Sequence, residues 1–270
     1  MPILLLLVFA LTTGMLAALV SARYPRIAEA PTSRLTVALV VAIGGGVLFG
    51  ALAYLVRTNS HLIELDNGVA KWGNRHASAW STHALNVLTQ LGSLYVVLAL
   101  CVILAVWETV RERSVWAIAF IVAVMGGEEL LTLTVKQLAD RARPAFNPAA
   151  ATLGPSFPSG HSATAAAFYA TAALLLGRWR GRRARAVLTG LAVGIAVAVA
   201  ASRVLLDAHW LSDVIAGLAL GWAWFAVCGI AFGGRILRFG AAAETTAPAA
   251  AATKPVSSRP VAARSSDRST

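Results

Sequence analysis

Charged residues are scarce in this sequence. Asp, Glu, Lys and Arg make up 13% of the 270 residues, whereas hydrophobic residues make up 58%. A soluble domain carries about 25% charged residues, so the composition excludes an ordinary soluble globular protein. It predicts a polytopic helical membrane protein instead, because several apolar runs approach the roughly 20 residues that cross a bilayer as a helix.

Cysteine and carboxylate residues are also few. The two cysteines, Cys101 and Cys228, lie inside apolar runs, where they are typical of small buried hydrophobic residues. Their number and placement exclude a disulfide framework and a cysteine-based metal site. Asp and Glu total only 12, and they form no cluster suited to Mg²⁺ or to a pair of metal ions. We therefore expect no metal and no cofactor.

Positive charge is in excess. The formal net charge of +11 would indicate nucleic acid as a partner of a soluble protein, but in a membrane protein Lys and Arg collect in cytoplasmic loops. The excess also attracts anionic lipids or a phosphorylated substrate. We expect membrane lipids and no nucleic acid as partners; the sequence leaves the oligomeric state open. The Ala- and Arg-rich composition indicates a bacterial source.

Seven apolar runs predict an all-α transmembrane bundle. The first lacks the basic residues that begin a cleaved signal peptide, so we interpret it as an extra N-terminal helix before a six-helix core. The predicted spans are 2–21, 35–56, 84–107, 115–135, 161–177, 185–201 and 210–232. Residues 1–34 then form the extra helix and a cytoplasmic loop, and residues 35–235 form the main domain.

Two segments outside the spans have their own character. Residues 57–83 mix polar and aromatic side chains, which predicts a short amphipathic helix in the membrane interface. Residues 240–270 consist mainly of Ala, Thr, Ser, Pro and Arg, a composition typical of a disordered tail.

The arginines predict the orientation in a bacterial inner (plasma) membrane. The segment "RWRGRRAR" at 178–185 holds five arginines in eight residues and is expected in the cytoplasm. Because the chain changes sides at each predicted span, segments 22–34 and 108–114 and the tail fall on the same side. Segments 57–83, 136–160 and 202–209 then face the periplasm or exterior.

Three polar clusters fall on this outer face. They are "KQLADRARP" with Lys136 and Arg143, "PSGHS" at 158–162, and "SRVLLDAHWLSD" at 202–213. Each has an ordinary interpretation alone: a lysine that extends to the interface, a helix N-cap, and a stabilising His–Asp pair. Cations on an outer face nevertheless run against the positive-inside trend, which favours an anionic ligand.

The residue types in these clusters suit phosphate. An arginine fork binds phosphate through two parallel hydrogen bonds. Ser159 and Gly160 precede an apolar helix whose N-terminus favours anions. His209 and Asp213 are four apart, so we expect them on one helix face, where the carboxylate fixes the imidazole tautomer and leaves the other nitrogen as nucleophile or base.

Together the clusters resemble the signature of the type 2 phosphatidic acid phosphatase (PAP2) superfamily, which includes the vanadium haloperoxidases. Lys136 followed after six residues by Arg143-Pro144 matches the first motif. Residues 158–161 match the second, Pro-Ser-Gly-His, and Ser202-Arg203 with His209 and Asp213 match the third. The resemblance covers about 35–232 and leaves out the first span and the tail.

The resemblance implies a metal-independent lipid phosphatase. His209 attacks phosphorus to form a phosphohistidine, Asp213 orients it, and His161 protonates the leaving oxygen. The phosphoryl oxygens are then held by Lys136, Arg143, Arg203 and the backbone at Ser159 and Gly160. The candidate substrates are undecaprenyl diphosphate, phosphatidic acid, phosphatidylglycerophosphate and diacylglycerol diphosphate. The motifs do not choose among them, and their frequency within the family favours undecaprenyl diphosphate and phosphatidic acid. The alternatives are a vanadate-dependent haloperoxidase and a non-catalytic protein that binds or transports lipid phosphates.

Two further carboxylates, Glu129 and Asp207, are candidates for supporting roles. Glu128 and Glu129 lie inside an apolar span, where a carboxylate usually faces a polar interior. Glu129 is seven residues before Lys136 and so lies on about the same face, which suggests that it closes a buried polar network below the site. Asp207 lies near the cations and either tunes them or faces water.

Overall fold

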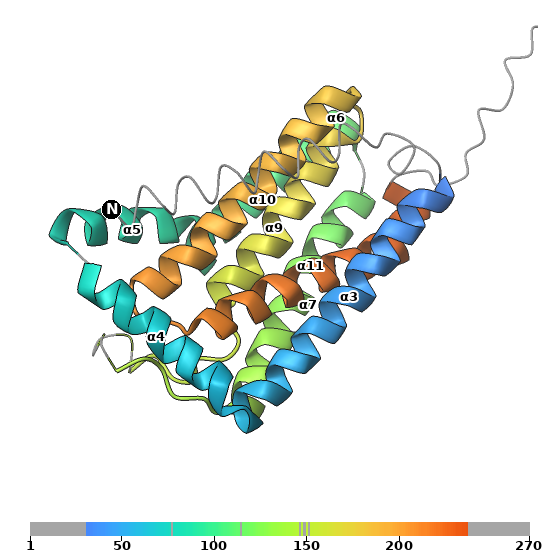
Figure 1. The fold of residues 1–270 in the computed structure, drawn as a ribbon. Coiled ribbons are helices and arrows are strands. Elements are labelled where there is room, and N and C mark those ends of the chain that lie inside the picture. The colour runs from blue at the N-terminus through green and yellow to red at the C-terminus, as the bar shows by residue number, and fades with distance from the viewer. Residues whose placement is uncertain are drawn as a thin grey trace, which may run out of the picture. The chain divides into compact units, whose positions relative to one another are not determined.

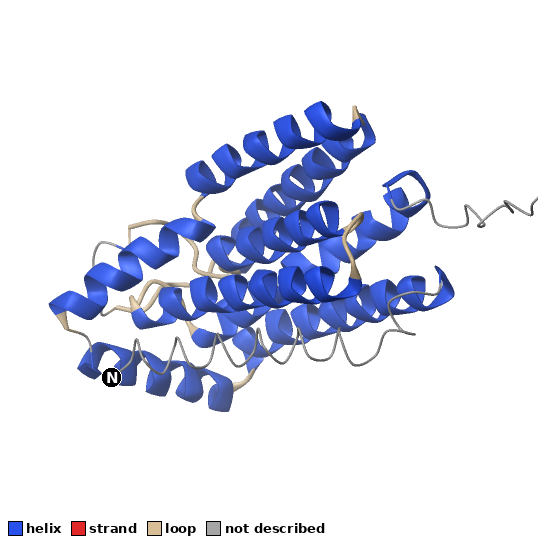
Figure 2. Cartoon of the chain, turned by 90° about the horizontal axis from the view of Figure 1, so that it is seen from above, coloured by secondary structure: helices blue, strands red, loops and turns tan. Residues whose placement is uncertain are grey.

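The computed structural model describes residues 31–76, 78–113, 115–145, 147, 150 and 152–236. In this part of the chain the backbone forms eight α-helices and one short 3₁₀-helix. They are α3 (Pro31–Thr58), α4 (Ser60–His76), α5 (Ala79–Thr89), η1 (Gln90–Gly92), α6 (Leu94–Glu112), α7 (Val115–Ala139), α9 (Gly160–Gly177), α10 (Arg182–Leu205) and α11 (Leu211–Ile236). The described segments contain helices and loops and no strand (Figure 2). The predicted all-α fold class is confirmed.

Five of the described helices are long and apolar enough to cross a membrane. They are α3, α6, α7, α10 and α11. Their outer surfaces carry large apolar side chains such as Val40, Ile103 and Leu130, which are 65%, 64% and 66% exposed. Exposed apolar side chains at this density suit contact with lipid rather than with water. The prediction of a multi-pass membrane protein is confirmed.

Helix α9 is the sixth helix of the bundle and is the most enclosed. It packs against α10, α11, α7 and α6, and its side chains from Ser162 to Phe168 are all buried. Alanine and threonine dominate this helix, because side chains that face other helices need small volume rather than hydrophobicity. Its lower hydropathy therefore reflects an interior position.

The predicted span 84–107 was wrong over residues 84–93. Residues up to Thr89 belong to α5, the chain turns through η1, and the apolar helix α6 begins only at Leu94. Ser93 has an extended backbone, so the two helices cannot form one continuous span. The predicted span 2–21, the rest of the segment 1–30 and the tail 240–270 lie outside the described residues.

Helices α4 and α5 lie at one end of the bundle (Figure 1). Helix α4 contacts α10 and α11, and α5 contacts α10. One face of α4 is buried, through Asp66, Ala70 and Gly73, and its other faces are largely exposed, as the amphipathic pattern predicted. This end of the bundle also receives the loop between α7 and α9 (Figure 1).

Candidate active site

The ends of four helices carry the predicted site residues. Lys136 lies in the last turn of α7 and Arg203 in the last turn of α10. Ser159 immediately precedes α9, and Asp213 lies in the first turn of α11. Because α7 and α10 end where α9 and α11 begin, the three sequence motifs meet at one end of the bundle (Figure 1).

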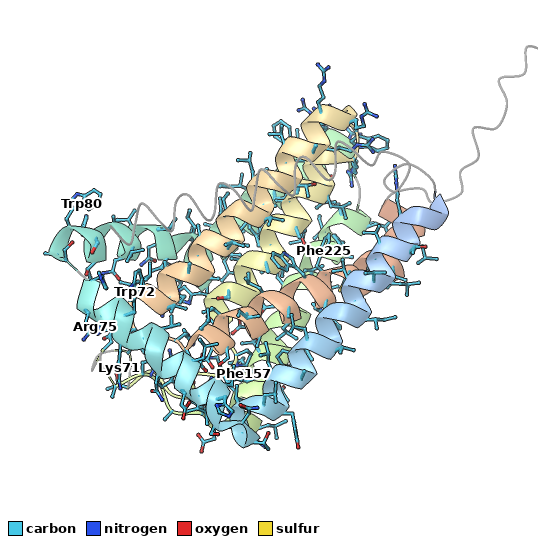
Figure 3. The ribbon with its side chains drawn as sticks, viewed as in Figure 1. Lys71, Trp72, Arg75, Trp80, Phe157 and Phe225 are labelled. Atoms are coloured by element: carbon cyan, nitrogen blue, oxygen red, sulfur yellow. The ribbon has the colours of Figure 1, made fainter. Side chains whose placement is uncertain are left out.

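Phe157 closes the packing behind this end. It is fully buried, and its ring stacks on Phe49 of α3 with the ring centroids 5.9 Å apart. It also packs against Val56, Val135 and Ala216, which places it where α3, α7 and α11 converge (Figure 3). The segment that leads into "PSGHS" is therefore anchored in an apolar cluster.

His209 lies in the loop between α10 and α11, and not on a helix face as predicted. Its Nδ1 faces Asp213 Oδ2 at 3.5 Å, which is longer than an ordinary hydrogen bond. The same Oδ2 accepts a hydrogen bond from the Trp210 backbone N–H at 3.0 Å, as a residue in the third position of a helix does for its N-cap. The pair thus forms across the start of α11, since the helix begins only at Leu211.

The other ring nitrogen of His209 faces Arg143. The Arg143 guanidinium nitrogen Nη1 lies 3.1 Å from Nε2. A guanidinium group only donates hydrogen bonds, so Nε2 carries the lone pair and Nδ1 carries the proton that points at Asp213. This is the tautomer that a nucleophilic Nε2 requires.

His209 is also poised in its uncharged form. Its side chain is 3% exposed, and burial lowers the pKa of His209 to about 4, with Asp213 opposing the shift and Arg143 and Arg203 adding to it. An imidazole with this pKa stays neutral well below pH 6.5, its ordinary value.

Arg143 is fixed by three backbone carbonyl groups. It donates to Gly154 O at 2.9 Å, to Ala208 O at 2.7 Å and to Pro155 O at 3.3 Å. Burial lowers the pKa of Arg143, and Asp213 partly opposes this, but an arginine remains charged at neutral pH. These bonds hold one permanent positive charge directly beside Nε2.

Lys136, Arg203 and His161 complete the cationic side of the site. Lys136 Nζ donates to Pro155 O at 3.1 Å, the same carbonyl oxygen that Arg143 contacts. Arg203 is buried and donates to the Thr89 hydroxyl at 3.2 Å, and its Nε has no hydrogen-bond partner among the described residues. His161, in the first turn of α9, lies within electrostatic reach of all three cations and of His209. A buried guanidinium N–H without a partner can still bind an anion.

Ser159 differs from its predicted role. Its backbone N–H donates to Asp213 O at 3.0 Å, and its hydroxyl accepts a bond from the Ser162 hydroxyl at 3.0 Å. The Ser159 amide is thus committed to holding α9 against α11 and cannot donate to phosphate. The first N–H groups within α9, beginning with Gly160, have no intrahelical acceptor and can take that part.

Among the supporting carboxylates, Glu129 lies within electrostatic reach of Lys136, as its spacing predicted. The buried carboxylate of α7 is Glu128, which accepts hydrogen bonds from Thr132 at 2.8 Å and from Thr164 of α9 at 3.2 Å. Glu129 is only half-buried, because adjacent residues on a helix point about 100° apart. Asp207 lies buried in the α10–α11 loop with a positive φ of 51°. Burial raises the pKa of Asp207 to about 6.

Two residues at the site were given no role from the sequence, namely Arg141 and Asp66. Arg141 Nη1 donates to Asp213 Oδ1 at 2.6 Å, and its Nη2 donates to Asp66 Oδ2 at 2.8 Å. Asp66 lies on α4, 75 residues earlier in the chain than Arg141. The signal that could have found it is the spacing of Asp66, Ala70 and Gly73, which places the carboxylate on the small-residue face of an amphipathic helix.

Comparison with known proteins decides the family. The sequence profile of the PAP2 superfamily matches residues 96–236, which is more than half of the chain. The chain belongs to the PAP2 superfamily. The profile covers all three motifs of the site just described.

Individual relatives place the protein among the membrane lipid phosphatases of the PAP2 superfamily. It is 31% identical to phosphatidylglycerophosphatase B of Bacillus subtilis over 178 residues, which are 64% of this chain and 85% of that protein. It is 42% identical to a lipid A 1-phosphatase of Rhizobium johnstonii over 85 residues, 28% of this chain and 31% of that protein. The predicted phosphoric ester hydrolase of PAP2 type is therefore confirmed.

A solved structure agrees with the fold of this PAP2 protein. The crystal structure of a transmembrane PAP2 type phosphatidylglycerolphosphate phosphatase from Bacillus subtilis superimposes with a TM-score of 0.69 at 29% identity. The match covers 74% of this chain and 99% of that chain.

Proposed function

We propose that the protein hydrolyses phosphate mono- or diphosphate esters of lipids through a phosphohistidine formed at His209. The observation that carries the proposal is the hydrogen-bond pattern of His209: Arg143 marks Nε2 as the lone-pair nitrogen, and Asp213 faces the protonated Nδ1. In the proposal the phosphoryl group takes the place of the Arg143 N–H at Nε2, which frees the lone pair for attack and leaves the guanidinium beside the phosphoryl oxygens.

The reaction proceeds in two steps. In the first, Nε2 of His209 attacks phosphorus, the P–O bond to the lipid breaks, and His161 gives its proton to the leaving oxygen. In the second, water attacks the phosphohistidine, His161 takes the proton of that water, and the P–N bond breaks to release phosphate. Asp213 stabilises the positive charge that His209 carries in between, as a carboxylate does for an adjacent imidazolium.

Charge stabilisation comes from the cations around the site. Phosphoryl transfer depends mainly on positioning and on stabilising the equatorial oxygens. Lys136, Arg143 and Arg203, together with the first amides of α9, supply both in the proposal. No three His, Cys, Asp or Glu side chains in the described ranges are grouped so that they could hold a metal ion. We predict full activity in excess EDTA.

The substrate is a lipid whose phosphate reaches this end of the bundle while its chains remain in the bilayer. Phosphatidylglycerophosphate, phosphatidic acid and undecaprenyl diphosphate are the candidates. The similarity to phosphatidylglycerophosphatase B, which extends over 85% of that protein, supports the first of these candidates. We propose that the site faces the periplasm or exterior, since the segment at 178–185, rich in arginine, lies at the opposite ends of α9 and α10.

The test is phosphate release by the purified protein in detergent and excess EDTA from these three lipids. We expect release from at least one of them, and a loss on the order of 10⁴-fold or more in His209→Ala, because removing a nucleophile removes the covalent route. Rapid quenching in alkali with radiolabelled substrate should place the label on the peptide that contains His209.

Three outcomes would contradict the proposal. A wild-type protein that binds these lipids and releases no phosphate would be a binding or transport protein. Activity that EDTA abolishes and Mg²⁺ restores would exclude the metal-independent route. Label on a different residue would exclude His209 as the nucleophile.

A further inference from the structure

An ion-paired chain runs from helix α4 to the residue that faces the His209 ring. Arg141 lies in its middle, with Nη1 bonded to Asp213 Oδ1 at 2.6 Å and Nη2 bonded to Asp66 Oδ2 at 2.8 Å. All three side chains are secluded from solvent, at 13% exposure for Arg141, 1% for Asp66 and 0% for Asp213. None of them contacts a position where the substrate would bind in the proposed reaction, except through His209.

Ser212 adds hydrogen bonds to both Asp66 and Arg141. Its backbone N–H donates to Asp66 Oδ1 at 2.9 Å, and its hydroxyl donates to Asp66 Oδ2 at 2.5 Å. The same hydroxyl accepts a bond from Arg141 Nη1 at 2.7 Å. The Asp66 carboxylate therefore accepts three hydrogen bonds from two neighbours, which fixes its position at the start of α11.

This series of ion pairs from Asp66 through Arg141 constrains how Asp213 can face His209. Arg141 occupies Oδ1, and the Trp210 N–H together with Nδ1 of His209 occupies the Oδ2 side. With both oxygens engaged, the carboxylate cannot rotate about its terminal bond. The Arg141 guanidinium is itself held from the other side by Asp66 and stacks on the Trp210 ring, 5.5 Å from its centroid.

Asp66 also offsets the positive charge that Arg141 places beside Asp213. A lone arginine on Asp213 would neutralise the carboxylate and weaken its interaction with the imidazolium that forms at His209. A second carboxylate on the same arginine returns the cluster to a net negative charge, and this effect is large because the groups are screened little by water.

We propose that Asp66 and Arg141 are positioning residues for the reaction, acting on His209 through Asp213. The inference rests on the proposed function, since it assigns these residues a part in the phosphohistidine route. It makes α4, the helix outside the bundle, part of the catalytic unit through a buried contact at the end of α10, where Gly73 of α4 packs near Leu205.

The test compares Asp66→Asn with wild type for kcat, KM and melting temperature in detergent. A positioning role predicts a 10- to 100-fold lower kcat, expressed per folded molecule, with KM changed by less than about 3-fold, because the phosphate ligands are untouched. Arg141→Lys retains the charge but cannot bridge two carboxylates, so it should lower kcat in the same way. If Asp66→Asn fails to fold, the kcat of Arg141→Lys tests the positioning role instead.

A matched control is present at the other end of the bundle. Glu108 and Arg178 form a second buried ion pair, with side chains 2% and 5% exposed. Glu108→Gln should lower the melting temperature and leave kcat at the wild-type value. This control separates the loss of a buried ion pair from an effect on the reaction.

A double-mutant cycle tests the route through Asp213. In an Asp213→Asn background, adding Asp66→Asn should change kcat by less than 2-fold, because the coupled residue is already lost. Wild-type kcat in both Asp66→Asn and Arg141→Lys would overturn the inference, and so would an undiminished effect of Asp66→Asn in that background. Wild-type protein without phosphatase activity would instead refute the proposed function and the inference with it.

Discussion

At the scale of single residues, His209 is defined by what surrounds its two nitrogens. Arg143 donates to Nε2, so the ring presents a lone pair on that side. Burial and two arginines keep the ring uncharged, whereas Asp213 favours the charged form. Burial and the arginines thus keep the ring neutral before the reaction, and Asp213 stabilises the positive charge that phosphorylation of Nε2 creates.

The low pKa of His209 predicts an unusual pH profile. The neutral His209 ring is the reactive form, so the acid limb of kcat/KM should rise with pH until the pKa of His209 is passed. With the pKa of His209 lowered to about 4, the midpoint of the acid limb should lie near pH 4 rather than near 6.5. The measurement is kcat/KM between pH 3.5 and 8 in detergent, a window chosen to bracket both values.

Asp207 and the substrate provide the controls for this profile. The pKa of Asp207 is raised to about 6 by burial, and a phosphate monoester has its second ionisation near 6. The substrate ionisation is followed separately by phosphorus NMR. A limb near pH 6 that disappears in Asp207→Asn would assign the titration to Asp207 and contradict the prediction for His209.

The motif residues were predictable and their partners were not. Lys136, Arg143, His161, Arg203, His209 and Asp213 stand in fixed spacings that a single sequence displays. Asp66 has no such spacing to the motifs, because its contact with Arg141, 75 residues later, depends on how α4 packs. Glu129 was found from its spacing of seven residues to Lys136, whereas the bonds of Glu128 to Thr132 and to Thr164 of α9 depend on how α7 and α9 pack.

At the scale of secondary-structure elements, the contact between α9 and α11 holds the two halves of the site together. Glycines of α11 face the backbone at the start of α9: a Cβ added to Gly217 would overlap Ser159 O, and one added to Gly221 would overlap Ala163 O. The helices can therefore approach closely only where these side chains are absent. This approach places Asp213 O beside the Ser159 N–H.

Gly221→Ala should destabilise the protein. The added methyl group meets backbone rather than a flexible side chain, so α9 and α11 must separate, at a cost of about 1–3 kcal/mol. We expect a melting temperature in detergent lower by roughly 5 °C. Gly229→Ala, in the same helix with open space around its Cβ position, should not lower it. Equal melting temperatures for the two variants would contradict the close-contact interpretation.

Hydropathy predicted the bounds of the lipid-facing helices more accurately than those of the other helices. The long helices α3, α7 and α11 match predicted spans because their outer surfaces must be apolar. The α5–α6 boundary was missed because the apolar run continues through a turn at Ser93. Helix α9 was recognisable by length, although its small interior residues reduce the hydropathy that defines a span.

At the scale of the whole membrane domain, the two ends of the bundle differ in their charges. At the end that carries the site, Arg203 is buried and Lys136 and Arg143 are half-buried among helix ends. At the other end, Arg178 is paired with the buried Glu108, and Trp179, Arg180, Gly181 and Arg182 are exposed. Exposed arginines in a short loop set orientation, whereas buried cations do not contribute as loop charges.

This difference predicts which end faces outward. Gly68 on α4, at the end with the site, and Gly181, between α9 and α10, are both exposed and have open space at the Cβ position, so cysteine can replace either one. Cys101 and Cys228 are buried and should give little background. In intact cells, a membrane-impermeant maleimide should label Gly68→Cys, and it should label Gly181→Cys only after the membrane is opened. The reverse pattern would place the phosphate site on the cytoplasmic face, and substrates would then have to come from the inner leaflet.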